Sequence, residues 1–480
     1  MKTLLERAIA LIQQAGASYG DVRVRHDRHE SLAVKNGRPE HIARSESAGF
    51  GVRVIVDGAW GFFGTHRLEE SAVEDVVRQA VAIARAGARL QDKPVVLAPV
   101  EAVTARYETP HGRPPFDVPL EETLDLLVRA SEAMKGPNLK RAQAFFAAYD
   151  THQHFASTEG ARIEQHIVQT GGGIAATAIS GDDLQVRSYP NSFRGNFATA
   201  GYEYVEAMDL VGQAPRVAEE AEALLAAPPC PEGRRTILLD GGQLALQVHE
   251  SCGHPIELDR VLGMEIAYAG DSFLTIEKLG TFQYGSPQVT IVADATSPGG
   301  LGTFGYDDEG VPAQRTPIVE AGRFVGYLSS RETAPAIGRT SSGAMRASGW
   351  HRIPLIRMTN VNLLPGEAGS LQDLVADTAD GLLMLTNKSW SIDNKRLNFQ
   401  FGTEMCREIK GGRLGQVYKN ATYTGITPEF WGSCDAVCGP EAWQLWGTPN
   451  CGKGQPGQTA RVGHGVAPAR FRSVQVGVKA

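Results

Sequence analysis

The sequence has few cysteines, no long apolar run and no excess of basic residues. Its six cysteines in 480 residues are too sparse for a disulfide framework and are typical of a reducing compartment. No stretch of eighteen apolar residues occurs, which excludes a membrane-spanning helix. Lys and Arg number 47 against 54 Asp and Glu, so the basic surface that binds nucleic acid or an anionic membrane is missing. We expect a cytoplasmic protein with no nucleic-acid partner and no membrane association.

A secretion signal is also missing at the N-terminus. Glu6 and Arg7 interrupt the apolar stretch that a signal peptide requires. The apolar residues around them follow helical spacing instead, and we expect an amphipathic helix. These residues are Leu4, Leu5, Ala8, Leu11 and Ile12.

Glycine, in contrast, is plentiful: it accounts for 54 of the 480 residues, well above the average share of about 7%. Asn36-Gly37 and Asp57-Gly58 separate alternating apolar segments, a strong signal for two-residue hairpin turns. Ser71 and Glu74 form a possible capping box for a helix that stops near Gly87. The first 90 residues therefore read as a helix, antiparallel strands and a second helix.

Proline-rich stretches divide the rest of the chain. Residues 91–119 contain six prolines and predict an extended connection, followed by a helix at about 120–135. Residues 145–206 read as short strands with glycine turns at Gly160, Gly171–Gly173 and Gly181, and a helix follows at about 207–226. Three prolines near residue 230 suggest a domain boundary there.

The predicted fold class is α+β with two domains. Residues 1–229 form an N-terminal domain of helices and an antiparallel sheet. Residues 230–480 form a β-rich C-terminal domain, in which a strand at 235–240 precedes a helix from about 243 to 254. Most later segments are short strands bounded by glycine.

That helix carries the segment Val-His-Glu-Ser-Cys-Gly-His-Pro, residues 248–255. Neutral imidazoles at His249 and His254 are suitable zinc ligands, and Glu250 is suited to take a proton from a metal-activated water. The common zinc-protease helix spaces its histidines by four residues. A spacing of five turns the second imidazole roughly 140° away from the first on a regular helix.

Two neighbouring residues offer a way around this spacing. Gly253 permits unusual dihedral angles, and Pro255 disfavours helical geometry at His254. We therefore expect the helix to end or bulge at the second histidine. An ordinary polar helix end, with His254 interacting with the helix dipole, remains open at this point.

A catalytic zinc site needs a third protein ligand. Glu257, Asp259 and a distant cysteine are candidates from the residues alone. Cys451 stands out because glycine and Lys453 surround it, so we expect an exposed thiolate.

Several other patterns have simpler explanations. Gly447-x-x-x-x-Gly452-Lys453 imitates a phosphate loop but continues into Gly454, where a hydroxyl should bind Mg²⁺. Cys252, Cys434 and Cys438 are expected to be small buried thiols.

Two polar clusters are expected to face solvent. His152 and His154 alternate on one strand face, and we expect no carboxylate or third histidine near them, so a solvated strand is the simpler explanation. The acidic loop Asp307, Asp308 and Glu309 is expected to be exposed because its charges repel one another, unless it recognises a peptide amine or a cation.

Segments spread over the whole chain resemble the TldD/PmbA family, and in particular its TldD-type subunit. They are the HExxxH helix, Ser389–Asp393, Cys438–Glu441 running into Thr448–Lys453, the Gly49–Val54 strand and Gly463-His464-Gly465. The resemblance implies that His249, His254 and Cys451 bind one Zn²⁺ per chain and that Glu250 is the catalytic base. The implied activity is cleavage of unfolded peptides, including leader peptides in peptide maturation. The implied assembly is a dimer around a chamber, with a TldE/PmbA-like partner or an identical chain.

We therefore expect a zinc-dependent metalloprotease, a hydrolase that uses metal-activated water. His464 and Lys453 are candidate hydrogen-bond donors to the oxyanion. The alternative is a non-catalytic peptide-binding or assembly subunit whose metal is structural or absent, since a strand-rich domain can hold an extended peptide without chemistry.

Overall fold

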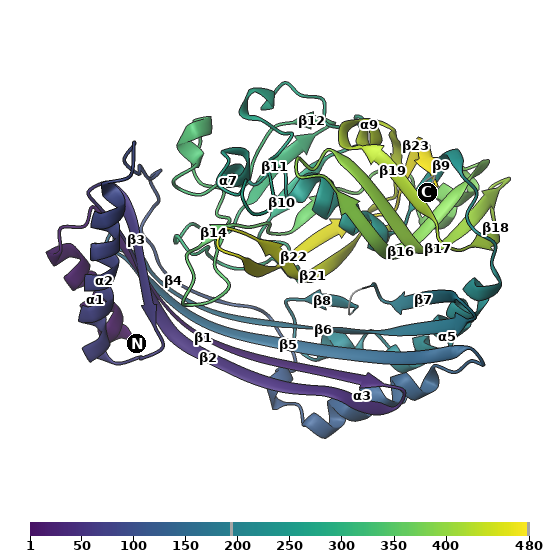
Figure 1. Cartoon of the computed structure of the whole chain (residues 1–480), viewed down its shortest axis with the longest axis horizontal. Coiled ribbons are helices and arrows are strands. Elements are labelled where there is room, and N and C mark those ends of the chain that lie inside the picture. The colour runs from purple at the N-terminus through teal and green to yellow at the C-terminus, as the bar shows by residue number, and fades with distance from the viewer. Residues whose placement is uncertain (193–194, 478–480) are drawn as a thin grey trace.

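A long, curved sheet forms the N-terminal part of the molecule, and the C-terminal part lies against its inner face (Figure 1). The computed structural model describes residues 1–192 and 195–477. The sheet has the order β3-β2-β1-β5-β6-β4, with β7 and β8 also paired to β6. All these pairs are antiparallel except β4 with β6. The strands are β1 (Tyr19–Lys35), β2 (Arg38–Val56), β3 (Ala59–Thr65), β4 (Thr104–Glu108), β5 (Leu139–Ser157), β6 (Arg162–Ser180), β7 (Asp183–Tyr189) and β8 (Asn196–Ala198).

The two predicted hairpins are confirmed. Asn36 and Gly37 connect β1 to β2, and Asp57 and Gly58 connect β2 to β3. All four residues have positive φ angles between 52° and 80°, as the turns that match strand twist require.

The prediction of short strands over 145–206 is wrong for β5 and β6, which each have 19 residues, but β7 and β8 are short. Gly160 and Gly181 lie in the connections after β5 and β6, as expected. Gly171–Gly173 lie inside β6 and not in a turn. A Cβ at Gly172 would lie 2.4 Å from the carbonyl oxygen of Phe145, and one at Gly173 would lie 2.5 Å from the Cα of Gly195. These glycines allow backbone segments to approach closely.

Helices cover the outer face of the sheet at its two ends. At one end α1 (Lys2–Gln14) and α2 (Glu70–Ala88) bury a common core with β1 and β2. At the other end α3 (Leu120–Ala133) and α5 (Leu210–Ala226) pack on β5 and β6, beside the short α4 (Glu203–Glu206). The expected capping box is absent, because α2 begins at Glu70 and Ser71 is already inside its first turn.

A closed barrel dominates the C-terminal part. Its five strands pair in the cycle β16-β9-β23-β19-β17-β16, and β18 and β20 extend it. They are β9 (Gly233–Leu239), β16 (Asp380–Ile392), β17 (Asn398–Lys410), β18 (Arg413–Tyr418), β19 (Thr422–Ile426), β20 (Cys434–Val437) and β23 (Ala469–Val476). The α+β fold class is therefore confirmed.

Smaller elements surround the barrel. The sheet β12-β11-β10-β15 and the pairs β13–β14 and β21–β22 comprise β10 (Ile291–Asp294), β11 (Arg315–Glu320), β12 (Arg323–Phe324), β13 (Met345–Arg346), β14 (Leu355–Ile356), β15 (Val361–Leu363), β21 (Gln444–Lys453) and β22 (Gln458–Val466). The helices here are α6 (Gly241–Val248), α7 (Leu258–Val261), α8 (Leu371–Ala376) and α9 (Thr427–Gly432). Within residues 1–192 and 195–477, every helix is too short or too polar to cross a membrane.

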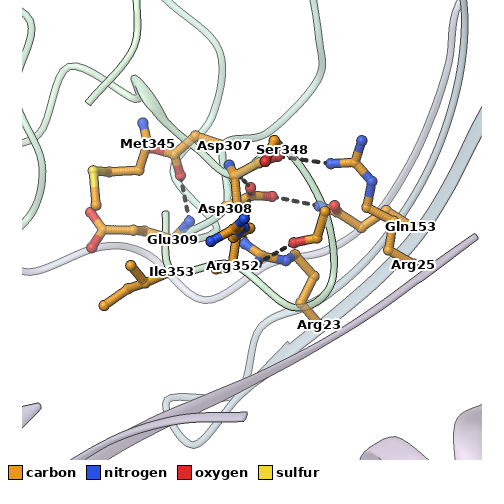
Figure 2. Close-up of polar contacts among 12 residues, drawn as sticks. Arg23, Arg25, Gln153, Asp307, Asp308, Glu309, Met345, Ser348, Arg352 and Ile353 are labelled. Atoms are coloured by element: carbon orange, nitrogen blue, oxygen red, sulfur yellow. Dashed lines mark hydrogen bonds and ion pairs between the residues drawn. The ribbon is translucent and has the colours of Figure 1, made fainter. Parts of the chain in front are cut away.

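The acidic loop connects the two parts of the molecule, and the expectation that it faces solvent is wrong (Figure 2). Asp308 pairs with Arg23 of β1 at 2.9 Å and accepts a hydrogen bond from Gln153 of β5 at 2.8 Å. Glu309 pairs with Arg53 of β2 at 3.3 Å. Because Arg23 is itself buried, Asp308 compensates a charge that would otherwise be isolated between the two parts. Glu309 adds a second carboxylate to Asp21 beside the buried Arg53.

Candidate metal centre

The helix that carries the histidines changes its geometry at the first of them. Asp240 caps α6 by accepting a hydrogen bond from the backbone N–H of Gln243 at 2.7 Å. From His249 to Gly253 the chain forms one π-helical turn, η2, in which the N–H of His254 donates to the carbonyl of His249. This i to i+5 bond widens the turn, so the fifth residue comes round over the first. The expected bulge at the second histidine is confirmed.

The side chains of His249, His254 and Cys451 meet at one point. Each offers one ligand atom, and these atoms all lie within 4.8 Å of one another. The Sγ of Cys451 lies 3.7 Å from Nε2 of His254. Cys451 comes from β21, about 200 residues after the helix, and is only 5% exposed. The expectation of an exposed thiolate is therefore wrong, because β21 packs this side chain against η2.

Hydrogen bonds behind the two histidines fix which ring nitrogen each presents. The Nδ1–H of His464 donates to the carbonyl of Val361 at 3.2 Å, so its Nε2 accepts from Nδ1 of His249 at 2.8 Å. The Nδ1 of His254 donates to Glu257 at 3.0 Å. Both histidines are thereby left with Nε2 for a cation, as in many metal sites.

The local charges favour the forms that bind a metal. Burial raises the pKa of Cys451, but His249, His254 and Arg357 lower it more, to well below that of a free thiol. Burial lowers the pKa of His254 well below its usual value, which keeps that imidazole neutral. Burial also lowers the pKa of His249, yet the thiolate of Cys451 raises it overall. A proton held beside the thiolate is what a bound cation would displace.

Glu250 and Arg396 lie beside this donor set in a cavity of about 330 Å³. Glu250 is nearly buried and pairs with Arg396, which lies in the turn between β16 and β17. Trp390, Trp446 and Asn387 also line the cavity. Arg396 was not predicted, since it is 146 residues from Glu250 and no local motif marks it.

The structure assigns other contacts to the remaining candidates. Asp259 pairs with Lys453 at 2.6 Å, and Glu257 supports His254 from behind. Lys453 and His464 are fully buried and outside the cavity lining, so neither is in position to donate to an oxyanion.

The patterns set aside in the sequence are explained by burial or by strand structure. Cys252, Cys434 and Cys438 are buried, as expected, and burial raises the pKa of the first two to about 12 and of the third to about 11. The segment that imitates a phosphate loop is strand β21 and precedes no helix.

Three family models match nearly the whole chain. They are described as PmbA/TldA metallopeptidase domain 1, central domain and C-terminal domain, and they match residues 20–84, 113–225 and 232–477. The last of these contains all three donors and Glu250.

Full-length relatives support the same grouping. A metalloprotease of Methanothermobacter thermautotrophicus is 31% identical over 96% of this chain and 95% of its own. A metalloprotease of Methanocaldococcus jannaschii is 29% identical over 93% and 94%. A zinc metalloprotease TldD homolog of Saccharolobus solfataricus is 21% identical over 97% and 98%.

Solved structures share the fold. A Thermotoga maritima protein matches with a TM-score of 0.77 and 20% identity over 99% of this chain and 100% of its own. TldE from Thermococcus kodakarensis matches with a TM-score of 0.72 and 16% identity over 99% and 100%. The resemblance noted in the sequence is thus confirmed, and the chain belongs to the TldD/PmbA family of metallopeptidases.

Proposed function

We propose that the chain is a zinc-dependent peptidase in which His249, His254 and Cys451 bind one Zn²⁺ and Glu250 is the general base. The observation that carries this proposal is the convergence of the three donors with Glu250 at one cavity. One thiolate and two neutral imidazoles are a typical zinc donor set that leaves a coordination position open. When bound, the ion would supply Lewis acidity toward a water molecule and the scissile carbonyl.

Glu250 moves the proton in this scheme. Arg396 holds Oε2 of Glu250, so Oε1 takes the proton of the attacking water and passes it to the leaving nitrogen. Arg396 also lines the cavity, where its guanidinium orients the carboxylate and places a positive charge near the substrate carbonyl.

The proposed substrate is an unfolded segment or a leader peptide. A cavity of this volume takes only a few residues, and peptide bonds already paired in a folded domain are not free to enter. Residues 446–452 of β21 line the cavity, and an extended peptide can add to such a strand through main-chain hydrogen bonds. Specificity for sequence is then loose.

We further propose that the chain works in the cytoplasm as a dimer around a chamber, with a TldE/PmbA-like subunit or a second identical chain. Four large, exposed apolar side chains in one segment support an interface with another subunit. Leu262, Met264, Ile266 and Tyr268 are each 39–64% exposed. The six free cysteines are consistent with a reducing compartment.

The test compares the chain with its Glu250→Gln variant. Glutamine keeps the size of the side chain but cannot take the proton, so cleavage of an unfolded protein should fall by about 10²–10⁴-fold. Zinc content, measured by mass spectrometry of the metal, should stay at one ion per chain at the catalytic site. The same substrate left folded should remain intact.

The contradicting results are equally definite. Undiminished cleavage by Glu250→Gln excludes the proposed base. If the chain binds peptide but does not bind zinc and does not cleave the peptide, either alone or with its partner, it is instead the non-catalytic binding subunit. Equal cleavage of folded and unfolded substrate excludes the enclosed chamber.

A further inference from the structure

The outer face of the N-terminal sheet carries a polar stripe between its two helical layers. Along β1, outward residues are apolar under α1 and α2 (Val22, Val24) and again under α3 and α5 (Leu32, Val34). Between them the outward positions are His26, Arg28 and Glu30. Along β5 the same alternation gives Phe146 and Ala148 at one end and Ala156 at the other, with Asp150, His152 and His154 between them.

Three histidines form a row across neighbouring strands of this stripe. His26 of β1 is paired in register with His152 of β5, which is paired with His166 of β6. The rings of His152 and His166 stack with centroids 3.9 Å apart and planes 14° from parallel. The expectation that His152 has no carboxylate or third histidine nearby is wrong. Asp150 lies two residues before it on the same face of β5, and strand pairing brings His26 and His166 beside it.

The nitrogens of two of these histidines point at a single oxygen. Oδ1 of Asp150 lies 2.9 Å from Nε2 of His166 and 3.4 Å from Nε2 of His152. Two ligands about 2.0–2.1 Å from a tetrahedral ion lie about 3.4 Å apart, so these separations are close to those in a formed site. Arg28 pairs with the other oxygen, Oδ2.

The far side of His166 is also arranged as in a metal site. Its Nδ1 lies 3.2 Å from Oε1 of Glu108, on the neighbouring strand β4. A carboxylate at Nδ1 holds that proton in place and presents Nε2 to an ion. The cluster thus has two imidazoles, one carboxylate and a supporting carboxylate behind.

We propose that Asp150, His152 and His166 bind a second divalent transition-metal ion, distinct from the proposed catalytic zinc. Imidazole nitrogens favour Zn²⁺, Co²⁺ or Cu²⁺ over Mg²⁺ and Ca²⁺, which prefer oxygen alone. The ion would take the place of the direct contacts between Oδ1 and the two nitrogens. Because His152 is about half exposed, water completes the coordination.

The site lies on the opposite face of the sheet from the C-terminal part. Thr151 and Gln153, which alternate with Asp150 and His152 on β5, face inward, and Gln153 contacts the acidic loop. A bound ion here would link β5 to β6 and, through Glu108, to β4, without reaching the catalytic cavity.

The test counts zinc ions on the natural chain and four variants. Each is freed of metal, equilibrated with buffered Zn²⁺, desalted and measured by mass spectrometry of the metal and by titration calorimetry. We expect two ions on the natural chain and one on His152→Asn, with the affinity for the outer ion reduced at least tenfold. His166→Asn is a second ligand variant. His154→Asn, on the same strand face but outside the donor set, is the matched control and should keep both ions.

The two proposed sites can be tested independently of each other. Cys451→Ala should keep the outer ion and lose the inner one, and only the inner site should give a sulfur-to-metal charge-transfer band with Co²⁺. If His152→Asn and His166→Asn bind zinc as the natural chain does, the outer site is refuted, and loss of the ion in Cys451→Ala still supports the catalytic proposal. If these variants lose an ion but Cys451→Ala does not, the outer site is supported and the catalytic one is not.

Discussion

At the scale of single residues, the groups behind the proposed zinc ligands decide how those ligands are presented. Glu257 is fully buried and accepts the Nδ1–H of His254, and it also lies 3.4 Å from Lys453. A carboxylate in this position orients the ring and makes its other nitrogen a stronger donor.

We predict that Glu257→Gln weakens zinc binding at the inner site by about 10–100-fold, because a neutral amide orients the imidazole ring less firmly and does not raise the basicity of its Nε2. Competition with a chromophoric chelator measures the affinity. Glu265→Gln is the control, since Glu265 is equally buried and near Lys453 but does not touch His254. Equal zinc affinity in the natural chain and Glu257→Gln would contradict the supporting role of Glu257.

The sequence predicts only in part which residues meet at the candidate metal centre. Local features suffice for His249, Glu250 and the bulge at His254, because Gly253 and Pro255 act within the same few residues. Cys451 is one of several candidates until the family resemblance is used. His464 and Arg396 lie 215 and 146 residues from the groups they contact, and no local spacing connects them.

At the scale of elements, strand β6 depends on glycine where other backbone crosses it. Gly172 sits opposite Phe146 in β5 and beside Asn196 in β8, in the middle of the sheet. A side chain has no room there, so the strand needs glycine at this point. In the sequence alone, a run of three glycines indicates a turn, because the backbone that crosses the strand is not visible.

We predict that Gly172→Ala destabilises the protein by about 1–3 kcal/mol, the usual cost of overpacking a well-packed site. The added Cβ would lie 2.4 Å from a backbone oxygen that cannot move aside without breaking strand pairing. Urea unfolding measures the change. Gly432→Ala, where nothing lies within 4 Å of the new Cβ, should unfold at nearly the same midpoint as the natural chain. A Gly172→Ala variant as stable as this control would refute the argument.

Elements defined by neighbouring residues are predictable here, and those defined by distant pairing are not. Both hairpins and helices α1 and α3 follow from turn residues and periodicity. The barrel closes through pairs such as β9 with β23, whose residues are more than 200 positions apart, so the sequence yields only separate short strands.

At the scale of the whole molecule, the N-terminal sheet and the barrel share a buried carboxyl group. Glu404 of β17 accepts hydrogen bonds from the backbone N–H of Ser188 at 2.8 Å and from its hydroxyl at 2.7 Å, and it pairs with Arg187 at 3.2 Å. Burial raises the pKa of Glu404 from its ordinary 4.5 to about 7, although Arg187 acts in the opposite direction.

This shift predicts a stability that declines with pH. The folded state holds the proton of Glu404 more tightly than the unfolded chain, so its contribution is present below about pH 4.5 and is lost as the pH rises through 7. Between pH 5 and 8 the loss is about 2–3 kcal/mol. Between pH 5 and 8 the free energy of unfolding of Glu404→Gln should fall by about 2–3 kcal/mol less than that of the natural chain. Urea unfolding at both pH values measures the difference. Parallel declines in the two proteins would show that Glu404 does not titrate in this way.

The contact between the acidic loop and the arginines of the sheet also has a consequence for the order of synthesis. The sheet is complete at Ala198, but its charge partners Asp308 and Glu309 leave the ribosome more than a hundred residues later. Until then Arg23 must stay hydrated, because an unpaired charge is costly to bury, whereas Arg53 already has Asp21 of β1 as a partner. The inner face of the sheet around Arg23 therefore stays hydrated during translation, and this part of the nascent N-terminal half reaches its final packing only after the loop has emerged.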